Sequence, residues 1–393
     1  KICKRTGKGG AKERVSSVFN RGNDRSQGQR PFKQDGRRTD HRYFPENKNG
    51  GLMKKSRNFA VKVSLILTAM LLVSLATTPM YAADYKLRIA CSHKPVSPWV
   101  QAAQYFEKEL EALTGGRIDV TVHHSATLGN TREVCEMVRN NTLEAAIPGS
   151  AQLSTYTPEI GVTVLAYIFK SDESMFGVLD GPVGNYIDSK LAEANFHNLG
   201  WYKNGFRSVT NDKRPIQKLE DLNGFKLRVL PSPSVIAFFK EVGVNPMHID
   251  WAELFEAMKK GVVEGQENPP FFVWLGKVYE MNKYYSFTKH MNEPGILVLS
   301  KKYYDMLPED LRLMVDVAAK KAEMWQRTKM TEANAECLEK LKKAGMQINE
   351  IPESELDRFR KVTYEKVYPT VIKNKDLGPN TKELIDLTIW AQQ

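Results

Sequence analysis

Two short stretches of sequence, Asn223-Gly-Phe-Lys-Leu-Arg-Val229 and Glu264-Gly-Gln-Glu-Asn-Pro269, decide the fold of this chain. We predict a strand from Lys226 to Leu230 in the first stretch and a helix from Ser234 to Val242 after it. In a parallel sheet the C-terminal ends of strands open into a crevice, and Arg228 lies at that end of its strand. A guanidinium in a crevice can hold a carboxylate through two parallel hydrogen bonds, so Arg228 is a candidate ligand-binding residue.

The chain on either side of these stretches alternates between strand and helix patterns. Asn130 with Glu133 forms a capping box that opens one helix, and Thr114-Gly-Gly116 ends another. Strand–helix–strand order predicts a mainly parallel sheet covered by helices, which is an α/β fold. Residues 84–393 are too many for one ordinary core and predict two domains. In the first part of this region we predict strands at 86–91, 117–123 and 143–147, and helices at 99–113 and 130–139.

A long helix is predicted in the last third of the chain. Helix-forming residues run from Pro308 to Lys343 before Gly345 stops them. At 1.5 Å per residue this helix would extend about 54 Å, more than the width of either domain. Its apolar residues lack a sustained heptad repeat, which favours a strut lying across both domains over a coiled coil. A shorter helix that ends at Gly261 is predicted to begin with a cap formed by Asp250 and Glu253.

The first 83 residues have the pattern of a leader. A basic cluster at 54–62, an apolar stretch from Val63 to Ala76 and small residues up to Ala83 predict a secretory signal peptide over residues 53–83. A membrane anchor is the alternative, but a span needs about 20 apolar residues. Residues 1–52 are expected to be a disordered upstream extension, with a basic nucleic-acid-binding arm as the alternative. The signal peptide predicts export to the periplasm.

The net charge of +11 at pH 7 comes from this leader. The first 83 residues contain 18 of the 57 Lys and Arg residues and 5 of the 46 Asp and Glu residues, which leaves residues 84–393 with a net charge of −2. This charge gives no indication of nucleic-acid or membrane-surface binding. Cys91, Cys135 and Cys337 permit one disulfide or none, and without a C-x-x-C motif they predict no metal site. We also predict no cofactor.

The two stretches quoted first, preceded by Asn204-Gly-Phe-Arg207, resemble in order and spacing the solute receptors of tripartite ATP-independent periplasmic (TRAP) transporters. The resemblance extends over residues 84–393. It implies a two-domain periplasmic binding protein fold with an interdomain cleft, hinge crossings and a long domain-spanning helix. By this pattern domain I comprises 84–204 plus 294–333, and domain II comprises 205–293 plus 334–393. Such receptors bind organic-acid anions and deliver them to membrane permease subunits that use an ion gradient.

The resemblance also implies roles for individual residues. It places the carboxylate-binding arginine at Arg228, for which a surface ion pair with Asp221 or Glu220 is the alternative. Arg207 matches a second arginine that contacts the ligand in the sialic-acid receptors of this family, and its alternative is a structural ion pair. The amide of Asn268 can donate and accept hydrogen bonds to a ligand, or it can cap its own turn.

Further binding residues are expected on both sides of the cleft. Trp251 matches an aromatic residue that packs against the ligand, with packing at a helix start as its alternative. Ser92 and the loop Gly149–Gln152 should form the wall from domain I. In the sialic-acid receptors a glutamate occupies the position of Gly149, so we expect an uncharged wall and a smaller or partly apolar carboxylate ligand. The complete predicted ligand-binding set is Arg228, Arg207, Asn268, Trp251, Ser92, Gly149, Gln152 and Ser232.

The sequence favours a receptor over an enzyme. It contains no G-x-S-x-G, no H-E-x-x-H and no Cys–His arrangement that would indicate a hydrolase or a metal enzyme. We therefore predict a monomeric periplasmic receptor for a small-molecule carboxylate. A periplasmic sensor subunit that binds the same ligand and signals to a membrane kinase is the alternative.

Overall fold

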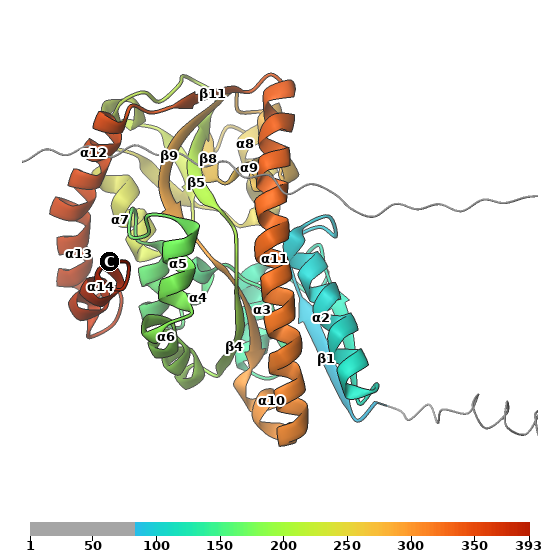
Figure 1. Cartoon of the computed structure of the whole chain (residues 1–393). Helices are drawn as coiled ribbons and strands as arrows, with labels where there is room; N and C mark the ends of the chain where they lie inside the picture. Colours follow the sequence, from blue (N-terminus) through green and yellow to red (C-terminus); the bar gives the residue numbers. More distant parts are fainter. Residues whose placement is uncertain (1–82) are drawn as a thin grey trace, which may run out of the picture. The chain divides into compact units, whose positions relative to one another are not determined.

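Two mixed β-sheets organise the chain in the computed structural model, which describes residues 83–393 (Figure 1). The strand order is β2-β1-β3-β10-β4 in the first sheet and β11-β9-β5-β8-β6-β7 in the second. The predicted extension 1–52 lies outside the described residues, as does the predicted signal peptide 53–83 apart from its last residue. The α/β fold expected from the sequence is confirmed. The domain boundaries 84–204 plus 294–333 and 205–293 plus 334–393 stay a prediction.

The strands and helices have the following bounds. The first sheet contains β1 (Tyr85–Ala90), β2 (Ile118–His123), β3 (Ala145–Ala146), β4 (Phe196–Tyr202) and β10 (Gly295–Ser300). The second contains β5 (Phe206–Asn211), β6 (Lys226–Val229), β7 (Asn245–His248), β8 (Gly265–Asn268), β9 (Tyr284–Asn292) and β11 (Gln347–Glu350). The α-helices are α2 (Pro98–Thr114), α3 (Thr131–Arg139), α4 (Ser150–Leu153), α5 (Asp172–Leu179), α6 (Pro182–Glu193), α7 (Pro233–Glu241), α8 (Leu254–Lys259), α9 (Pro270–Leu275), α10 (Lys301–Met306), α11 (Glu309–Lys343), α12 (Glu353–Val362), α13 (Tyr368–Asn374) and α14 (Thr381–Trp390). Short helical turns are η1 (Pro158–Val164), η2 (Leu219–Leu222), η3 (Trp251–Glu253), η4 (Val278–Glu280) and the π-helical η5 (Thr363–Val367).

The sheets are less parallel than the sequence predicts. β1 runs parallel to β2 and β3, and β6 runs parallel to β7 and β8. In contrast, β10 is antiparallel to β3 and β4, and β5 is antiparallel to β8 and β9. The reason is that the chain crosses twice between the sheets. It passes from the first sheet to the second between β4 and β5, and it returns between β9 and β10. Pairing of Tyr202 with Gly295 and of Phe206 with Asn292 places these two crossings side by side in opposite directions. The predicted parallel arrangement is therefore confirmed for β1 to β3 and β6 to β8 but not for the pairs of β5 and β10.

Helix caps agree with the sequence at one of the two predicted positions. At α3, the side chain of Asn130 accepts a hydrogen bond from the Glu133 N–H at 3.0 Å, and Glu133 accepts one from the Asn130 N–H at 2.8 Å. The predicted cap by Asp250 is wrong, since its side chain makes no capping hydrogen bond. The chain first forms the turn η3, and α8 begins only at Leu254.

The long helix α11 confirms the predicted strut. It begins directly after Pro308, contains 35 residues and lies along both sheets in Figure 1. Its buried residues Leu311 and Val315 pack in an apolar cluster with α2 and β4 of the first sheet. Nearer its C-terminal end, the side chain of Asn334 accepts a hydrogen bond from the N–H of Phe271 in α9 at 3.0 Å and donates one to the carbonyl of Asn204 at 2.9 Å.

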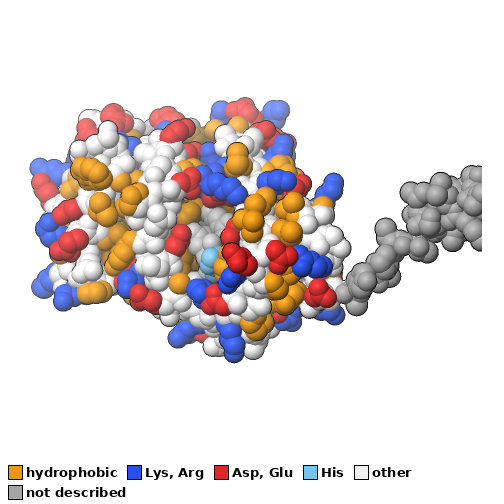
Figure 2. All heavy atoms as spheres, turned by 60° about the horizontal axis from the view of Figure 1, so that its bottom comes forward, with side chains coloured by type: hydrophobic (Ala, Val, Ile, Leu, Met, Phe, Trp, Pro, Cys, Tyr) orange, Lys and Arg blue, Asp and Glu red, His pale blue; other side chains and the backbone are white. Residues whose placement is uncertain are grey.

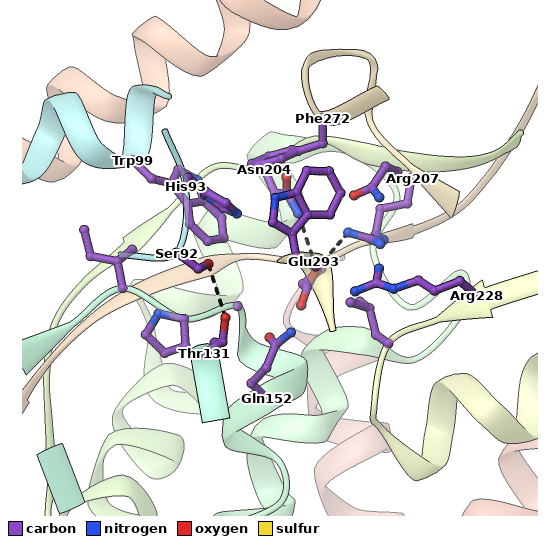
Figure 3. Close-up of a pocket in the computed structure, with 16 residues that line it drawn as sticks. Ser92, His93, Trp99, Thr131, Gln152, Asn204, Arg207, Arg228, Phe272 and Glu293 are labelled. Atoms are coloured by element: carbon purple, nitrogen blue, oxygen red, sulfur yellow. Dashed lines mark hydrogen bonds and ion pairs between the residues drawn. The ribbon is translucent and has the colours of Figure 1, made fainter. Parts of the chain in front are cut away.

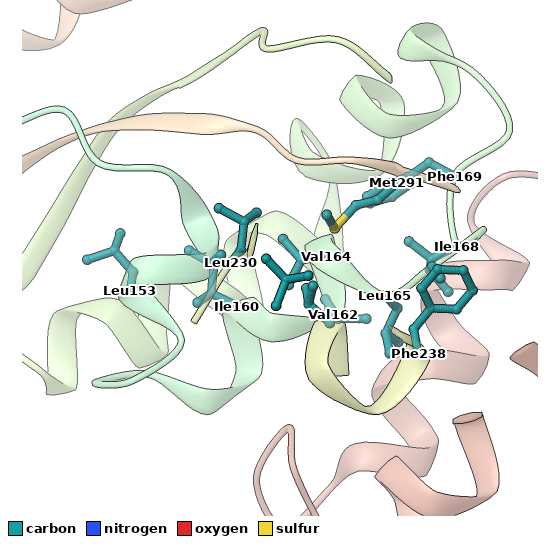
Figure 4. Packing of buried hydrophobic residues seen from close by; sticks show 14 of the residues in the cluster. Leu153, Ile160, Val162, Val164, Leu165, Ile168, Phe169, Leu230, Phe238 and Met291 are labelled. Atoms are coloured by element: carbon teal, nitrogen blue, oxygen red, sulfur yellow. The ribbon is translucent and has the colours of Figure 1, made fainter. Parts of the chain in front are cut away.

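The largest apolar cluster joins elements of both sheets. Leu153 of α4 and Ile160 of η1 belong to it, together with Leu230, which follows β6, Phe238 of α7 and Met291 of β9 (Figure 4). All five side chains are at least 97% buried. Burial of this kind is the main favourable contribution to folding, so the two halves of residues 83–393 share part of one core.

The sequence analysis found no charge pattern for nucleic-acid or membrane-surface binding and allowed one disulfide or none. Lys and Arg side chains alternate with Asp and Glu side chains on the face in Figure 2, without a large field of one sign. Cys91, Cys135 and Cys337 are buried free thiols, so no disulfide joins them. Of the helices within residues 83–393, none is both long and apolar enough to cross a membrane.

Candidate functional site

A small cavity collects polar side chains from both sheets (Figure 3). Its volume is about 50 Å³. Seven of the eight predicted site residues line it, whereas Ser232 does not. Ser232 is fully buried at the start of α7, and its hydroxyl has no hydrogen-bond partner in the described part of the chain. The lining residues are Ser92, His93, Trp99, Thr131, Ile147, Pro148, Gly149, Gln152, Asn204, Arg207, Arg228, Leu230, Trp251, Asn268, Phe272 and Glu293.

Arg228 presents a guanidinium to this cavity from the strand β6. The residue is 2% exposed, and its Nε donates a hydrogen bond to the carbonyl of Ile249 at 2.9 Å. Within residues 83–393 it forms no ion pair with Glu220 or Asp221, because Glu220 pairs with Arg358 instead and Asp221 accepts backbone hydrogen bonds from its own turn. Burial, and next the charge of Arg207, lower the pKa of Arg228 to about 10, so the guanidinium remains charged at neutral pH.

Arg207 lies beside Arg228 but is already paired. Its Nε and one terminal nitrogen bind the carboxylate of Glu267, the latter at 2.8 Å, and its other terminal nitrogen donates to Glu293 Oε2 at 2.9 Å. Burial lowers the pKa of Arg207, but the two carboxylates outweigh this effect and leave the pKa above its ordinary value. The same pairing overcomes the effect of burial on Glu267 and lowers its pKa to about 2. Arg207 therefore lines the cavity and also forms the structural ion pair considered as its alternative.

Glu293 brings a negative charge to the wall that the sequence predicted to be uncharged. A Cβ atom at Gly149 would lie 2.5 Å from Glu293 Oε1, so the absence of a side chain at Gly149 leaves room for this carboxylate. Glu293 also accepts hydrogen bonds from the Ala151 N–H at 3.3 Å and the Asn204 amide at 3.4 Å. Burial raises its pKa, Glu267 adds to this rise, and Arg207 opposes it. The expectation of an uncharged wall is therefore wrong, since a residue 144 positions along the chain supplies the charge.

Aromatic rings form another part of the lining. The His93 ring centroid lies 4.9 Å from that of Trp99 and 4.7 Å from that of Phe272. Trp251 meets Phe272 edge to face at 5.8 Å, which places the predicted Trp251 in this cluster. Burial lowers the pKa of His93 to about 3, so this ring is neutral at physiological pH. A neutral aromatic wall opposite charged groups suits a ligand with one polar and one less polar face.

Several polar atoms at the cavity have no partner within residues 83–393. They are the side-chain oxygens of Gln152 and Asn204 and Nδ1 of His93. In addition, Ser92 Oγ accepts a hydrogen bond from Thr131 at 3.2 Å, while the Asn268 amide nitrogen is bound to Gln266. A buried polar atom without a partner costs free energy, so these atoms are suited to hydrogen bonds with a ligand.

Sequence reasoning missed several of the residues that reach the cavity. They are Glu293, Asn204, Thr131, Trp99 and Phe272. Asn204 lies at the crossing between β4 and β5, and Glu293 lies at the crossing between β9 and β10. In the sequence, Glu293 and the following Pro294-Gly295 separate two strand patterns. That separation can be recognised in the sequence, but the proximity of Asn204 and Glu293 depends on the pairing of distant strands. Among the described residues, no group of three His, Cys, Asp or Glu side chains is placed to hold a metal ion.

Comparisons with known proteins agree with this fold and cavity. Residues 89–374 match the family model of bacterial extracellular solute-binding protein, family 7. A solute-binding protein of Chromohalobacter salexigens is 32% identical over 292 residues, 74% of this chain and 86% of that protein.

Solved structures extend the similarity to nearly the whole length of the receptors. A TRAP periplasmic solute binding protein from Chromohalobacter salexigens with bound D-glucuronate has a TM-score of 0.74 at 28% identity, covering 78% of this chain and 99% of that one. The sugar acid binding protein of Advenella mimigardefordensis in complex with galactonate has a TM-score of 0.74 at 27% identity, covering 79% and 100%. The TRAP resemblance predicted from the sequence is thereby confirmed, and the chain belongs to the bacterial extracellular solute-binding protein family 7 of TRAP receptors.

Proposed function

We propose that this protein captures a hydroxylated carboxylate, of the sugar-acid class, in the periplasm and delivers it to the membrane subunits of a TRAP transporter. The observation that carries the proposal is the guanidinium of Arg228. It is buried, it is charged, and among residues 83–393 its one hydrogen bond is to the Ile249 carbonyl through Nε. The two terminal nitrogens can therefore hold a ligand carboxylate in the bidentate manner typical of arginine.

The remaining polar atoms favour a ligand that also carries hydroxyl groups. Gln152, Asn204 and Glu293 present acceptor oxygens to the cavity, and a hydroxyl group can donate a hydrogen bond to each of them. A partly apolar carboxylate, as the sequence predicted, would leave the side-chain oxygens of Gln152 and Asn204 without donors. The family relatives support the same class, since one holds D-glucuronate and another galactonate.

Direct titration of the protein with sugar acids tests this function. We expect D-galactonate or D-glucuronate to bind in isothermal titration calorimetry and to raise the melting temperature, because a ligand that binds only the native state stabilises it. Arg228→Ala should weaken binding by on the order of 3–5 kcal/mol, or more than 100-fold, because the ligand carboxylate would be buried without its partner. Arg228→Lys should restore little, because an ammonium group lacks the two-pronged geometry.

Lys226→Ala provides a matched control on the same strand, since Lys226 is exposed and does not line the cavity. This variant should bind like the wild type. Unchanged affinity in Arg228→Ala would contradict the proposed role of this arginine, and no heat with any carboxylate would contradict the proposed function.

A further inference from the structure

Three ionised or ionisable side chains, Arg207, Arg228 and Glu293, line the cavity, and a fourth, Glu267, binds Arg207, so that the four charges cancel. Arg207, Arg228, Glu267 and Glu293 are each at most 3% exposed. Glu267 stays ionised because Arg207 binds both of its oxygens. With Glu293 also ionised, two positive charges meet two negative charges, and the cavity has no positive charge in excess. An anion that enters would then leave a net negative charge in a buried site, which is costly.

We propose that Glu293 determines ligand specificity by limiting the site to a ligand with one carboxylate group, and that Glu293 takes up a proton when this ligand binds. The inference rests on the proposed function. A protonated Glu293 restores the charge balance once a ligand carboxylate lies against Arg228. Among the described residues that line the cavity, a second ligand carboxylate would find no free cation, since Arg207 is held by Glu267.

The surroundings of Glu293 can accommodate both of its protonation states. As a carboxylate it accepts hydrogen bonds from Arg207 at 2.9 Å, Ala151 at 3.3 Å and Asn204 at 3.4 Å. As an acid it needs an acceptor, and the Gln152 Oε1, which lies beside the same face of Gly149, has no partner among the described residues. The charged and titratable groups around it are Arg207 on β5, Arg228 on β6, Glu267 on β8, His290 on β9 and His93 after β1.

The direction of the pH dependence follows from these groups. Burial raises the pKa of Glu293, whereas burial lowers the pKa values of His93 and His290. A bound anion raises the pKa of Glu293 further, so protons are taken up on binding and affinity increases as the pH falls. Where one full proton is taken up, Kd rises about tenfold for each unit of pH increase.

A matched pair of ligands tests the charge limit. D-galactonate and galactarate share their carbon chain and hydroxyl groups, and differ in that C6 is a hydroxymethyl group in the first and a carboxylate in the second. Isothermal titration calorimetry between pH 5.5 and 7.5, in buffers of different ionisation enthalpy, gives both Kd and the number of protons exchanged. We expect the wild type to take up protons with galactonate and to bind galactarate at least tenfold more weakly.

Glu293→Gln keeps the shape of the side chain and removes its charge. We expect this variant to lose the proton uptake and to reduce the preference for galactonate over galactarate by about tenfold. Glu350→Gln is the control, because Glu350 is exposed and pairs with Lys289 away from the cavity, and it should behave like the wild type.

Two results would overturn the inference. One is binding of both acids by the wild type with equal affinity and no proton uptake, a measurement that requires no variant to fold. The other is a folded Glu293→Gln protein that keeps the wild-type proton uptake and preference. If the wild type binds no sugar acid at all, the proposed function itself fails, and the inference fails with it.

Discussion

At the scale of single residues, Gly295 shows how closely the chain packs against Trp99 beside the cavity. It pairs with Gly149 across an isolated bridge, and a Cβ atom built on it would lie 2.4 Å from the ring of Trp99. Trp99 is buried, and its Nε1 donates to the carbonyl of Lys203 at 2.9 Å. The ring thus donates a hydrogen bond to Lys203, next to the crossing between β4 and β5, and packs against Gly295, next to the crossing between β9 and β10. A side chain larger than hydrogen at position 295 has no space.

Gly295→Ala should therefore destabilise the protein. We expect a loss of about 1–3 kcal/mol in the free energy of unfolding, because an added methyl group in a packed core forces its neighbours to move. Gly177→Ala is the control, since Gly177 lies in α5 with open space around it and alanine favours a helix by roughly 0.5–1 kcal/mol. Denaturant unfolding followed by circular dichroism would measure both. Equal stability of the two variants would show that Trp99 can move aside.

The residues that the sequence analysis placed at the site are those that lie in or beside a recognisable sequence motif. Arg228 and Asn268 lie at the ends of short strands in two recognisable stretches, so their positions could be predicted without knowing which strands pair. Glu293 could not be placed in this way. Its partners Arg207 and Ala151 are 86 and 142 positions away. Their proximity follows from the antiparallel pairing of the two crossings, which the sequence analysis did not predict.

At the scale of elements, α11 is the helix that contacts both halves of the fold. One residue on it, Asn334, binds two backbone groups in different elements, the Phe271 N–H and the Asn204 carbonyl. Helix length follows from an unbroken run of helix formers, which is why the sequence predicted α11 closely. The direction of strand pairing depends on tertiary connections, which explains why the antiparallel pairing of β5, β9 and β10 was not predicted.

Asn334→Ala should loosen the junction between α11 and the crossing at Asn204. We expect a loss of about 1–3 kcal/mol in stability, because one backbone N–H and one carbonyl would lose their partners. Glu332→Ala on the same helix removes only an exposed ion pair with Lys329, and such pairs contribute about 0–1 kcal/mol. Thermal unfolding of both variants in one buffer distinguishes them. Stability changes of equal size would mean that Asn334 acts as an ordinary surface residue.

At the scale of the whole molecule, the cavity is small for the ligand proposed to fill it. A volume of about 50 Å³ has room for a few water molecules, whereas typical ligand pockets measure about 300–1,000 Å³. The two sheets must therefore separate to admit a sugar acid. Ligand contacts with Arg228 from one sheet and Ser92 from the other can form together only when the sheets approach again, and this favours closure on binding.

Small-angle X-ray scattering should show this closure. We expect the radius of gyration to decrease when D-galactonate is added at saturating concentration. Galactonate added to Arg228→Ala at the same concentration is the control and should leave the radius unchanged, because that variant does not fill its site. A wild-type radius that stays constant at saturation would indicate a receptor that is closed before it binds.

The position of β10 has a consequence for the order in which the chain folds during synthesis. β10 lies between β3 and β4 in the first sheet, yet it follows both by more than 90 residues, after the whole of β5 to β9. A nascent chain that ends before Gly295 has β3 and β4 without the strand that joins them. Because pairing of distant segments is slow, the first sheet can be completed only when most of the polypeptide has left the ribosome. The late arrival of this one strand thus delays completion of the N-terminal half until most of the chain has been made.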